Sequence, residues 1–356
     1  MPFVNELLDH NRALLQAAAE QPASRTALTS RYLFEPSDVM ALLRSRIVGQ
    51  DAALAAIEAT LQVIKVNISD PARPLSVMLL IGPTGVGKTE IVRLLAQAIQ
   101  GRADAFCRID MNTLAQAHYA AALTGAPPGY VGSKEGATLF EVEAIEGSFS
   151  RPGIVLFDEI EKASPEVVRS LLNVLDQGQL TLSAGNKRID FRNSLIFMTS
   201  NVGAQAVWRQ RSQYTQGWRR WLGIQPQDTA VQQAALEQHF DPEFLNRIDR
   251  VLTFGRIDRP LLERLFEIEL TKLNQRLAKR DLTVWVDSDA RALLLRDHDA
   301  RYGARALARQ IRTVLEPLMA SYVMHQSQVR QLKVTVSAGR LAVCKMHSND
   351  DVQHHR

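Results

Sequence analysis

The sequence predicts an α/β protein in which a parallel sheet between helices is followed by a smaller α+β domain. Short apolar runs alternate with helical patterns up to residue 254, which is typical of βαβ units. Beyond that residue, long helices and a hairpin signal replace the alternation. The length of 356 residues agrees with about two domains, at roughly 150 residues per domain.

The composition is that of a globular protein. Hydrophobic residues make up 46% of the chain and charged residues 22%, which excludes a disordered or low-complexity chain. The net charge is +4, and 33 of the 42 positive residues are arginines, which suit ion pairs and phosphate recognition. So small a positive balance does not by itself indicate a nucleic-acid partner.

Cysteine content and hydropathy predict a cytoplasmic protein. Cys107 and Cys344 are too few for a disulfide framework, which indicates a reducing compartment. No apolar run approaches the ~18 residues of a membrane span, so no membrane association is expected. Residues 1–9 lack the basic and apolar regions of a secretory signal.

The expected elements follow the alternation in order. Apolar residues at helical spacing predict an amphipathic helix over 4–18, within an N-terminal helix and linker (1–40) that could serve in docking or as an adaptor. In the large domain, 41–254, we expect helices over 50–66, 89–99 and 165–176 and strands over 77–81, 106–109, 154–157 and 195–199. In the small domain, 255–346, we expect helices over 260–278 and 304–324, a strand over 282–286 and a hairpin of 332–336 with 341–345. The polar tail, 347–356, is predicted to be disordered.

A glycine-rich loop lies between an expected strand and an expected helix, where a phosphate-binding loop must lie. It fits the pattern G-x-x-x-x-G-K-[ST] in full, with the residues Gly82, Pro83, Thr84, Gly85, Val86, Gly87, Lys88 and Thr89. The glycines allow backbone N–H groups to surround phosphate oxygens. Lys88 supplies a charge for the β- and γ-phosphates, and Thr89 offers its hydroxyl to Mg²⁺.

Two adjacent acids end a buried strand further along the chain. Asp158 can hold the water shell of Mg²⁺, and Glu159 can orient and polarise an attacking water. Acids also favour the start of a helix, but the phosphate loop upstream makes the hydrolytic interpretation the better one. The two motifs together predict Mg²⁺-dependent hydrolysis of a nucleoside triphosphate.

Further motifs occur in a fixed order along the chain. They are Arg46-Ile47-Val48-Gly49-Gln50, Gly125-Ala126-Pro127-Pro128-Gly129-Tyr130-Val131-Gly132, Asp158-Glu159-Ile160-Glu161-Lys162-Ala163, Asp190-Phe191-Arg192-Asn193, Met198-Thr199-Ser200-Asn201, Phe244-Leu245-Asn246-Arg247-Ile248-Asp249 and Tyr302-Gly303-Ala304-Arg305. In this order they resemble the second, C-terminal ATPase module of the Clp/Hsp100 AAA+ proteins. The resemblance implies an AAA+ P-loop NTPase large domain, a small C-terminal lid domain, ATP and Mg²⁺ as cofactors, and a hexameric ring. From the length of 356 residues we expect neither the first ATPase ring nor the coiled-coil middle domain of the large family members.

The resemblance gives roles to individual residues. Asn201 resembles sensor 1, which helps to place the attacking water, and Arg305 resembles sensor 2 of the small domain. Arg247 resembles the arginine finger that reaches the nucleotide of a neighbouring subunit. Ile47 and Val48 stand where the family packs the adenine.

Some of the residues in these motifs have a simpler alternative interpretation. Arg247 could form an ion pair with Asp249 or Glu243 on a surface helix, and Asn201 could be an ordinary turn residue. The segment Gly129, Tyr130, Val131 and Gly132 resembles the pore loop that grips a polypeptide in the channel of the ring. Its tyrosine could instead be packed in a loop, but the flanking glycines favour an exposed, mobile segment. Two segments depart from the family pattern: residues 120–124, which precede the pore-loop motif, and the second pore-loop region, 180–187. These departures bear on how the substrate is gripped more than on ATP hydrolysis.

Residues 207–227 combine tryptophans with arginines: Trp208, Trp218 and Trp221 stand among Arg209, Arg211, Arg219 and Arg220. The mixture favours docking of a protein partner, because Trp and Arg dominate interface hot spots. Single-stranded nucleic acid, a ClpP-type peptidase held through Leu222-Gly223-Ile224, and an ordered surface flap are the alternatives.

The sequence as a whole predicts an ATP-dependent protein unfoldase or remodelling chaperone that threads polypeptide through a homo-hexameric ring. Two other functions stay open. One is an AAA+ motor acting on nucleic acid, and the other is a nucleotide switch that controls a partner assembly without threading.

Overall fold

The computed structural model describes residues 30–115, 140–182, 187–203, 228–257, 259–296, 303–326 and 329–346. The chain divides into two compact units after Phe254, with the segment Thr84–Val86 grouped with the second unit. Each unit has its own buried apolar core. In the part of the chain that is described, no helix has both the length and the apolar character needed to cross a membrane.

A five-stranded parallel sheet forms the centre of the first unit, with the strand order β2-β3-β6-β1-β7. The strands are β1 (Ser76–Ile81), β2 (Cys107–Asp110), β3 (Gly153–Asp158), β6 (Ser194–Ser200) and β7 (Arg250–Thr253). Every residue of β1, β3 and β6 is buried, as expected for central strands of a sheet that is covered on both faces. The four strands predicted in this region are all present, and the α/β class is confirmed.

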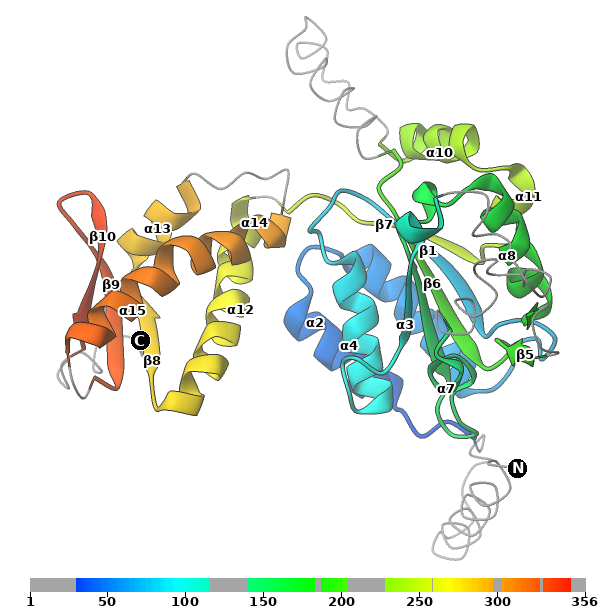
Figure 1. The fold of residues 1–356 in the computed structure, drawn as a ribbon, viewed down its shortest axis with the longest axis horizontal. Helices are drawn as coiled ribbons and strands as arrows, with labels where there is room; N and C mark the ends of the chain where they lie inside the picture. Colours follow the sequence, from blue (N-terminus) through cyan, green and yellow to red (C-terminus); the bar gives the residue numbers. More distant parts are fainter. Residues whose placement is uncertain are drawn as a thin grey trace, which may run out of the picture. The chain divides into compact units, whose positions relative to one another are not determined.

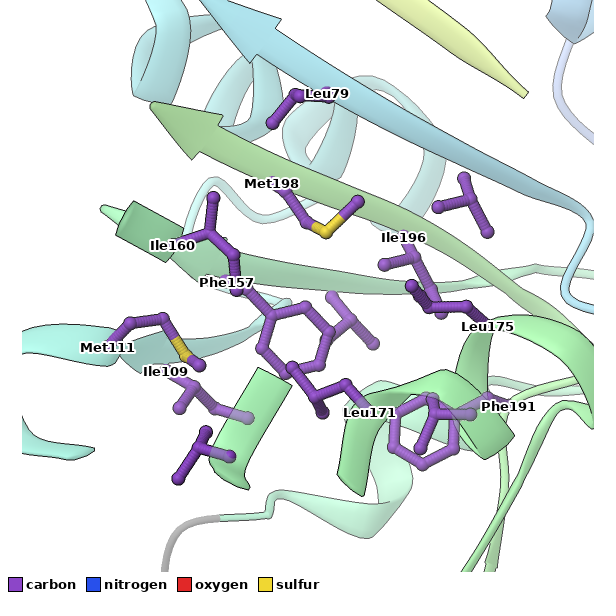
Figure 2. Close-up of a cluster of buried hydrophobic side chains, with 14 of the residues drawn as sticks. Leu79, Ile109, Met111, Phe157, Ile160, Leu171, Leu175, Phe191, Ile196 and Met198 are labelled. Carbon is purple, nitrogen blue, oxygen red and sulfur yellow. The ribbon is translucent and has the colours of Figure 1, made fainter. Parts of the chain in front are cut away.

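Helices cover both faces of the sheet (Figure 1). One face carries α2 (Pro36–Arg46), α3 (Asp51–Lys65) and α4 (Lys88–Gln100). The other carries α7 (Val142–Glu146), α8 (Pro165–Gln177), α10 (Asp228–His239) and α11 (Pro242–Leu245). Figure 2 shows Phe157 of β3 pointing from the sheet toward Leu171 of α8, within the apolar cluster of this second face.

Helix α8 illustrates why several boundaries could be predicted. The Ser164 hydroxyl accepts a hydrogen bond from the Val167 N–H, and Pro165 takes the first helical position. At the other end Gly178 adopts a left-handed conformation with φ 62°, which ends the helix without strain. These end signals are all visible in the sequence.

Several elements were not predicted. Strand β7 pairs in parallel with β1, but only Leu252 of its four residues is buried, so no apolar run marks it. A short hairpin of β4 (Gln179–Leu182) and β5 (Lys187–Asp190) forms a separate two-stranded sheet. The helices α10 and α11 were also missed.

The second unit has helices packed against a three-stranded sheet of order β10-β9-β8. Its elements are α12 (Arg259–Leu277), β8 (Thr283–Val286), α13 (Ser288–Arg296), α14 (Gly303–Gln310), α15 (Glu316–His325), β9 (Gln331–Ser337) and β10 (Arg340–Lys345). The predicted hairpin is present, and its two turn residues, Ala338 and Gly339, both have positive φ. A π-helical segment, Ile311–Leu315, joins α14 to α15, so the helix predicted over 304–324 is continuous but changes its pitch.

Both cysteines are free thiols. Cys107 is buried in β2, where burial raises the pKa of its thiol to about 11, and Cys344 is exposed in β10. The predicted helix over 4–18, the segment Gly129–Gly132, the whole Trp- and Arg-rich insertion of residues 207–227 and the tail 347–356 lie outside the described residues.

Candidate nucleotide-hydrolysis site

The loop between β1 and α4 is shaped by glycines at points where a side chain does not fit. Gly82 has φ 149°, and a Cβ there would lie 2.6 Å from the carbonyl oxygen of Phe254. Gly87, with φ 108°, is the residue that precedes the first turn of α4. The amino end of α4 therefore begins at Lys88. The N–H groups of a helix's first turn and the positive end of its dipole form the arrangement that binds phosphate.

Lys88 is buried, and its ammonium group lies inside the curve of this loop. Nζ donates hydrogen bonds to the carbonyl oxygens of Gly82 at 2.6 Å and Pro83 at 2.8 Å. It also donates to Oδ1 of Asn201 at 3.0 Å, across from the end of β6. The structure thus brings together a predicted phosphate-binding lysine and the predicted sensor amide.

The two predicted acids stand at the carboxyl end of β3. Asp158 is buried, and Glu159 is half-buried and adopts the left-handed conformation with φ 58° and ψ 53°. A residue other than glycine is uncommon in this conformation, and such residues cluster at functional sites. The Thr199 hydroxyl links the pair, because it donates to Oδ1 of Asp158 at 2.5 Å and accepts the N–H of Glu159 at 2.9 Å.

Glu161 fixes the orientation of Asn201. Its Oε1 accepts hydrogen bonds from the backbone N–H of Asn201 at 3.0 Å and from Nδ2 of the same residue at 3.2 Å. This arrangement leaves Oδ1 of Asn201 directed at Lys88. Glu161 and Thr199 stand within the matched motifs, but their roles were not predicted from the sequence. A polar residue inside a matched motif was the only available signal.

The residues predicted to pack adenine lie beside the phosphate loop. Ile47 and Val48 are both buried after the end of α2. A Cβ built on Gly87 would lie 3.5 Å from Cδ1 of Ile47. An apolar contact surface therefore borders the phosphate loop. Thr89, the predicted hydroxyl ligand of Mg²⁺, is half-buried in the first turn of α4.

Comparison with known proteins identifies the family. The family model of the AAA domain (Cdc48 subfamily) matches residues 73–251, and the model of the C-terminal, D2-small domain of ClpB protein matches residues 257–336. The chain belongs to the Clp family of AAA+ ATPases. As a member of this family it binds nucleotide and hydrolyses ATP.

Two relatives show how much of the chain the family covers. The ATP-dependent protease ATP-binding subunit-like protein AmiB of Pseudomonas aeruginosa is 47% identical over 355 residues, which span 92% of this chain and 94% of that protein. Chaperone protein ClpB of Propionibacterium freudenreichii is 40% identical over 294 residues, or 82% of this chain and 32% of that protein. The AAA+ module is therefore matched over nearly the whole of AmiB and over about a third of ClpB.

A solved structure agrees with this assignment. The closed-state cryo-EM reconstruction of Hsp104 with ATPγS and FITC-casein matches with a TM-score of 0.73 at 26% identity. The match covers 87% of this chain and 51% of the Hsp104 chain.

The two predicted arginines of the AAA+ module are Arg247 of the first unit and Arg305 of the second. Arg247 follows α11, and its Nη1 donates to the carbonyl oxygen of Glu243 at 2.8 Å, while Nη2 lies 3.2 Å from Oε1 of the same residue. Asp249 instead pairs with Arg73 and accepts the N–H of Val77. Arg305 is exposed on α14 in the second unit.

Proposed function

We propose that this AAA+ ATPase works as a hexameric ring that unfolds or remodels polypeptides, with Tyr130 pulling the substrate through a central pore. The observation that carries the proposal is the set of hydrolytic groups at one edge of the sheet, where Lys88 contacts Asn201 and Thr199 contacts both acids. The substrate class rests on the relatives, which are named as Clp protease ATP-binding subunits and a chaperone. The sequence motif Gly129-Tyr130-Val131-Gly132 supplies the proposed grip.

The residues of the site fit ATP with Mg²⁺. The Gly82–Thr89 loop already surrounds a buried ammonium group, and its lysine can exchange carbonyl oxygens for phosphate oxygens. Thr89 and Asp158 would hold Mg²⁺, which neutralises phosphate charge when it is bound. Ile47 and Val48 would pack the adenine.

Neighbouring side chains would carry out different tasks in ATP hydrolysis. Glu159 would orient the attacking water and accept its proton. Among the described residues, the carboxylate of Glu159 has no hydrogen-bond or ion-pair partner, whereas both oxygens of Asp158 are engaged. Asn201 would help to place the water.

The remaining residues extend the site beyond one domain. We assign Arg247 to the nucleotide site of the neighbouring subunit and Arg305 to a lid formed by residues 255–346. Residues 1–40 and the Trp- and Arg-rich insertion, 207–227, would dock protein partners. The supporting observation for the insertion is its composition.

The decisive experiment uses Glu159→Gln as a trap. The variant should bind ATP as the wild type does, and it should lose about 100- to 10,000-fold in turnover because the general base is missing. Affinity capture of the trapped ring from cells should then recover polypeptides, and Tyr130→Ala should abolish their unfolding while leaving ATP hydrolysis.

Other outcomes of the same capture contradict the proposal. Recovery of RNA or DNA that survives Tyr130→Ala, with binding that weakens steeply as salt rises, indicates a nucleic-acid motor. A stable partner that is captured but never unfolded indicates a nucleotide switch.

A further inference from the structure

The carboxylate assigned to Mg²⁺ already has a cationic partner. Arg108 lies in β2, and its Nη2 and Nε donate to Oδ2 of Asp158 at 2.5 and 3.1 Å. The other oxygen, Oδ1, accepts the hydroxyl of Thr199. Protein groups thus occupy both oxygens of Asp158.

The sheet register explains how Arg108 reaches this carboxylate. Residues of β2 alternate between buried and exposed, with Cys107 and Ile109 buried and Arg108 and Asp110 exposed. Asp110 is aligned with Asp158 on the neighbouring parallel strand, so Arg108 and Asp158 share one face of the sheet. The arginine extends along that face toward the carboxyl end of β3.

The two partners differ in exposure. The side chain of Asp158 is 11% exposed and that of Arg108 is 54% exposed, because β2 is an edge strand of the sheet. A carboxylate that is largely removed from water needs a positive partner or several hydrogen bonds. Glu159 follows directly in the chain, so Arg108 places a positive charge beside two adjacent carboxylates at the end of β3.

Hydrated Mg²⁺ and a guanidinium group use the same lone pairs of a carboxylate. Mg²⁺ keeps several waters and is held through few protein oxygens, so its waters must approach an oxygen of Asp158 closely. Oδ2 faces the exposed side chain of Arg108, which can move into solvent, whereas Oδ1 is bound to the buried Thr199. Oδ2 is therefore the oxygen at which the exchange can take place.

We propose that Arg108 is a charge placeholder. It holds Asp158 in position while no metal is bound and yields Oδ2 to the hydrated Mg²⁺ that accompanies ATP. The inference rests on the proposed role of Asp158 in binding Mg²⁺. It gives Arg108 a role that differs from that of a purely structural ion pair, because removal of the arginine should strengthen metal binding while weakening the metal-free protein.

The test measures the affinity of a fluorescent ADP analogue with Mg²⁺ and with EDTA, together with thermal unfolding in EDTA. The ratio of the two dissociation constants reports how much Mg²⁺ strengthens binding. In Arg108→Gln this ratio should rise about two- to fivefold, the range set by a partly exposed ion pair. The unfolding midpoint in EDTA should fall. Arg108→Lys keeps the positive charge but changes the geometry of the hydrogen-bond donors, so its ratio should lie between those of the wild type and Arg108→Gln.

A matched control removes a different arginine. Arg102 is exposed and pairs with the exposed Asp104 before β2 begins, so Arg102→Gln should leave the ratio unchanged. An unchanged or lower ratio in a folded Arg108→Gln protein overturns the placeholder role while leaving the Mg²⁺ site intact. If the ratio is one in the wild-type protein, Mg²⁺ does not strengthen nucleotide binding. That result would contradict both the Mg²⁺ site and the placeholder role.

Discussion

At the scale of single residues, Thr199 organises the two acids of the hydrolytic site. Its buried hydroxyl donates to the carboxylate of Asp158 and accepts the backbone N–H of Glu159. The second contact stabilises the left-handed backbone of Glu159, a conformation that costs of order 1–3 kcal/mol for a residue other than glycine. One side chain therefore contacts both the carboxylate that we propose to bind Mg²⁺ and the backbone of the residue that we propose as the general base.

Thr199→Val should separate these contributions, since valine keeps the shape of threonine but has no hydroxyl. We expect the free energy of unfolding to fall by about 1–3 kcal/mol, because the Glu159 N–H loses its acceptor. The kcat for ATP should fall by about 10- to 100-fold. Urea unfolding and a steady-state phosphate-release assay measure the two effects.

Thr199→Ser is the control, because it keeps the hydroxyl and should retain most of the activity. Wild-type kcat in Thr199→Val would mean that the hydroxyl has no part in placing the acids.

Much of the site could be predicted at this scale because some residues carry their chemistry in the local sequence. Lys88 and Asp158 stand in short patterns whose spacing is set by a single turn, and the structure places both at the carboxyl edge of the sheet. Arg108 and Glu161 act through contacts with residues distant in the chain, at Asp158 and Asn201. A single sequence gives the residue type at such positions but not the partner.

At the scale of elements, the close approach of α7 to the start of β3 depends on a missing side chain. A Cβ on Gly153 would lie 1.8 Å from the carbonyl oxygen of Ile145 and 2.5 Å from its carbonyl carbon. Both atoms belong to the backbone, so the helix would have to move. Because β3 ends in the two acids, this contact sets the position of the strand that carries them.

Gly153→Ala should therefore destabilise the protein by about 1–3 kcal/mol or more, as overpacking does in a well-packed core. The free energy of unfolding in urea measures it. Gly255→Ala provides the matched control, since a Cβ there would meet nothing within 4 Å, and its effect should stay within about 0.5 kcal/mol. Equal unfolding midpoints for the two variants would show that α7 can move away from the new side chain without lowering the free energy of unfolding.

The central strands could be predicted at this scale, whereas β7 could not. Strands β1, β3 and β6 are buried throughout, which produces the continuous apolar runs that the sequence displays. Strand β7 is at the sheet edge and has three exposed residues, so its local pattern resembles a loop. It is a strand because β1 pairs with it from Met78–Arg250 to Ile81–Thr253.

At the scale of the whole molecule, the question is whether Arg247 acts on the nucleotide site of its own chain or on that of a neighbouring subunit. Its guanidinium pairs with Glu243, one of the two carboxylates that the sequence offers as a partner on a surface helix. The ion pair is compatible with a role in a ring, because it holds the Arg247 side chain against Glu243 of α11 while leaving it 23% exposed. What distinguishes the two roles is the subunit on which the arginine acts.

Mixing two inactive variants decides this. If Arg247 serves a neighbouring subunit, Glu159→Gln and Arg247→Ala should each be inactive alone, but mixed rings should regain ATP hydrolysis. In randomly mixed rings at equal amounts, about one quarter of the interfaces combine an intact Glu159 with an intact Arg247. Arg247→Ala mixed with the double variant Glu159→Gln/Arg247→Ala has no such interface and should remain inactive. If the first mixture stays as inactive as this control while the variants still assemble together, Arg247 acts within its own chain.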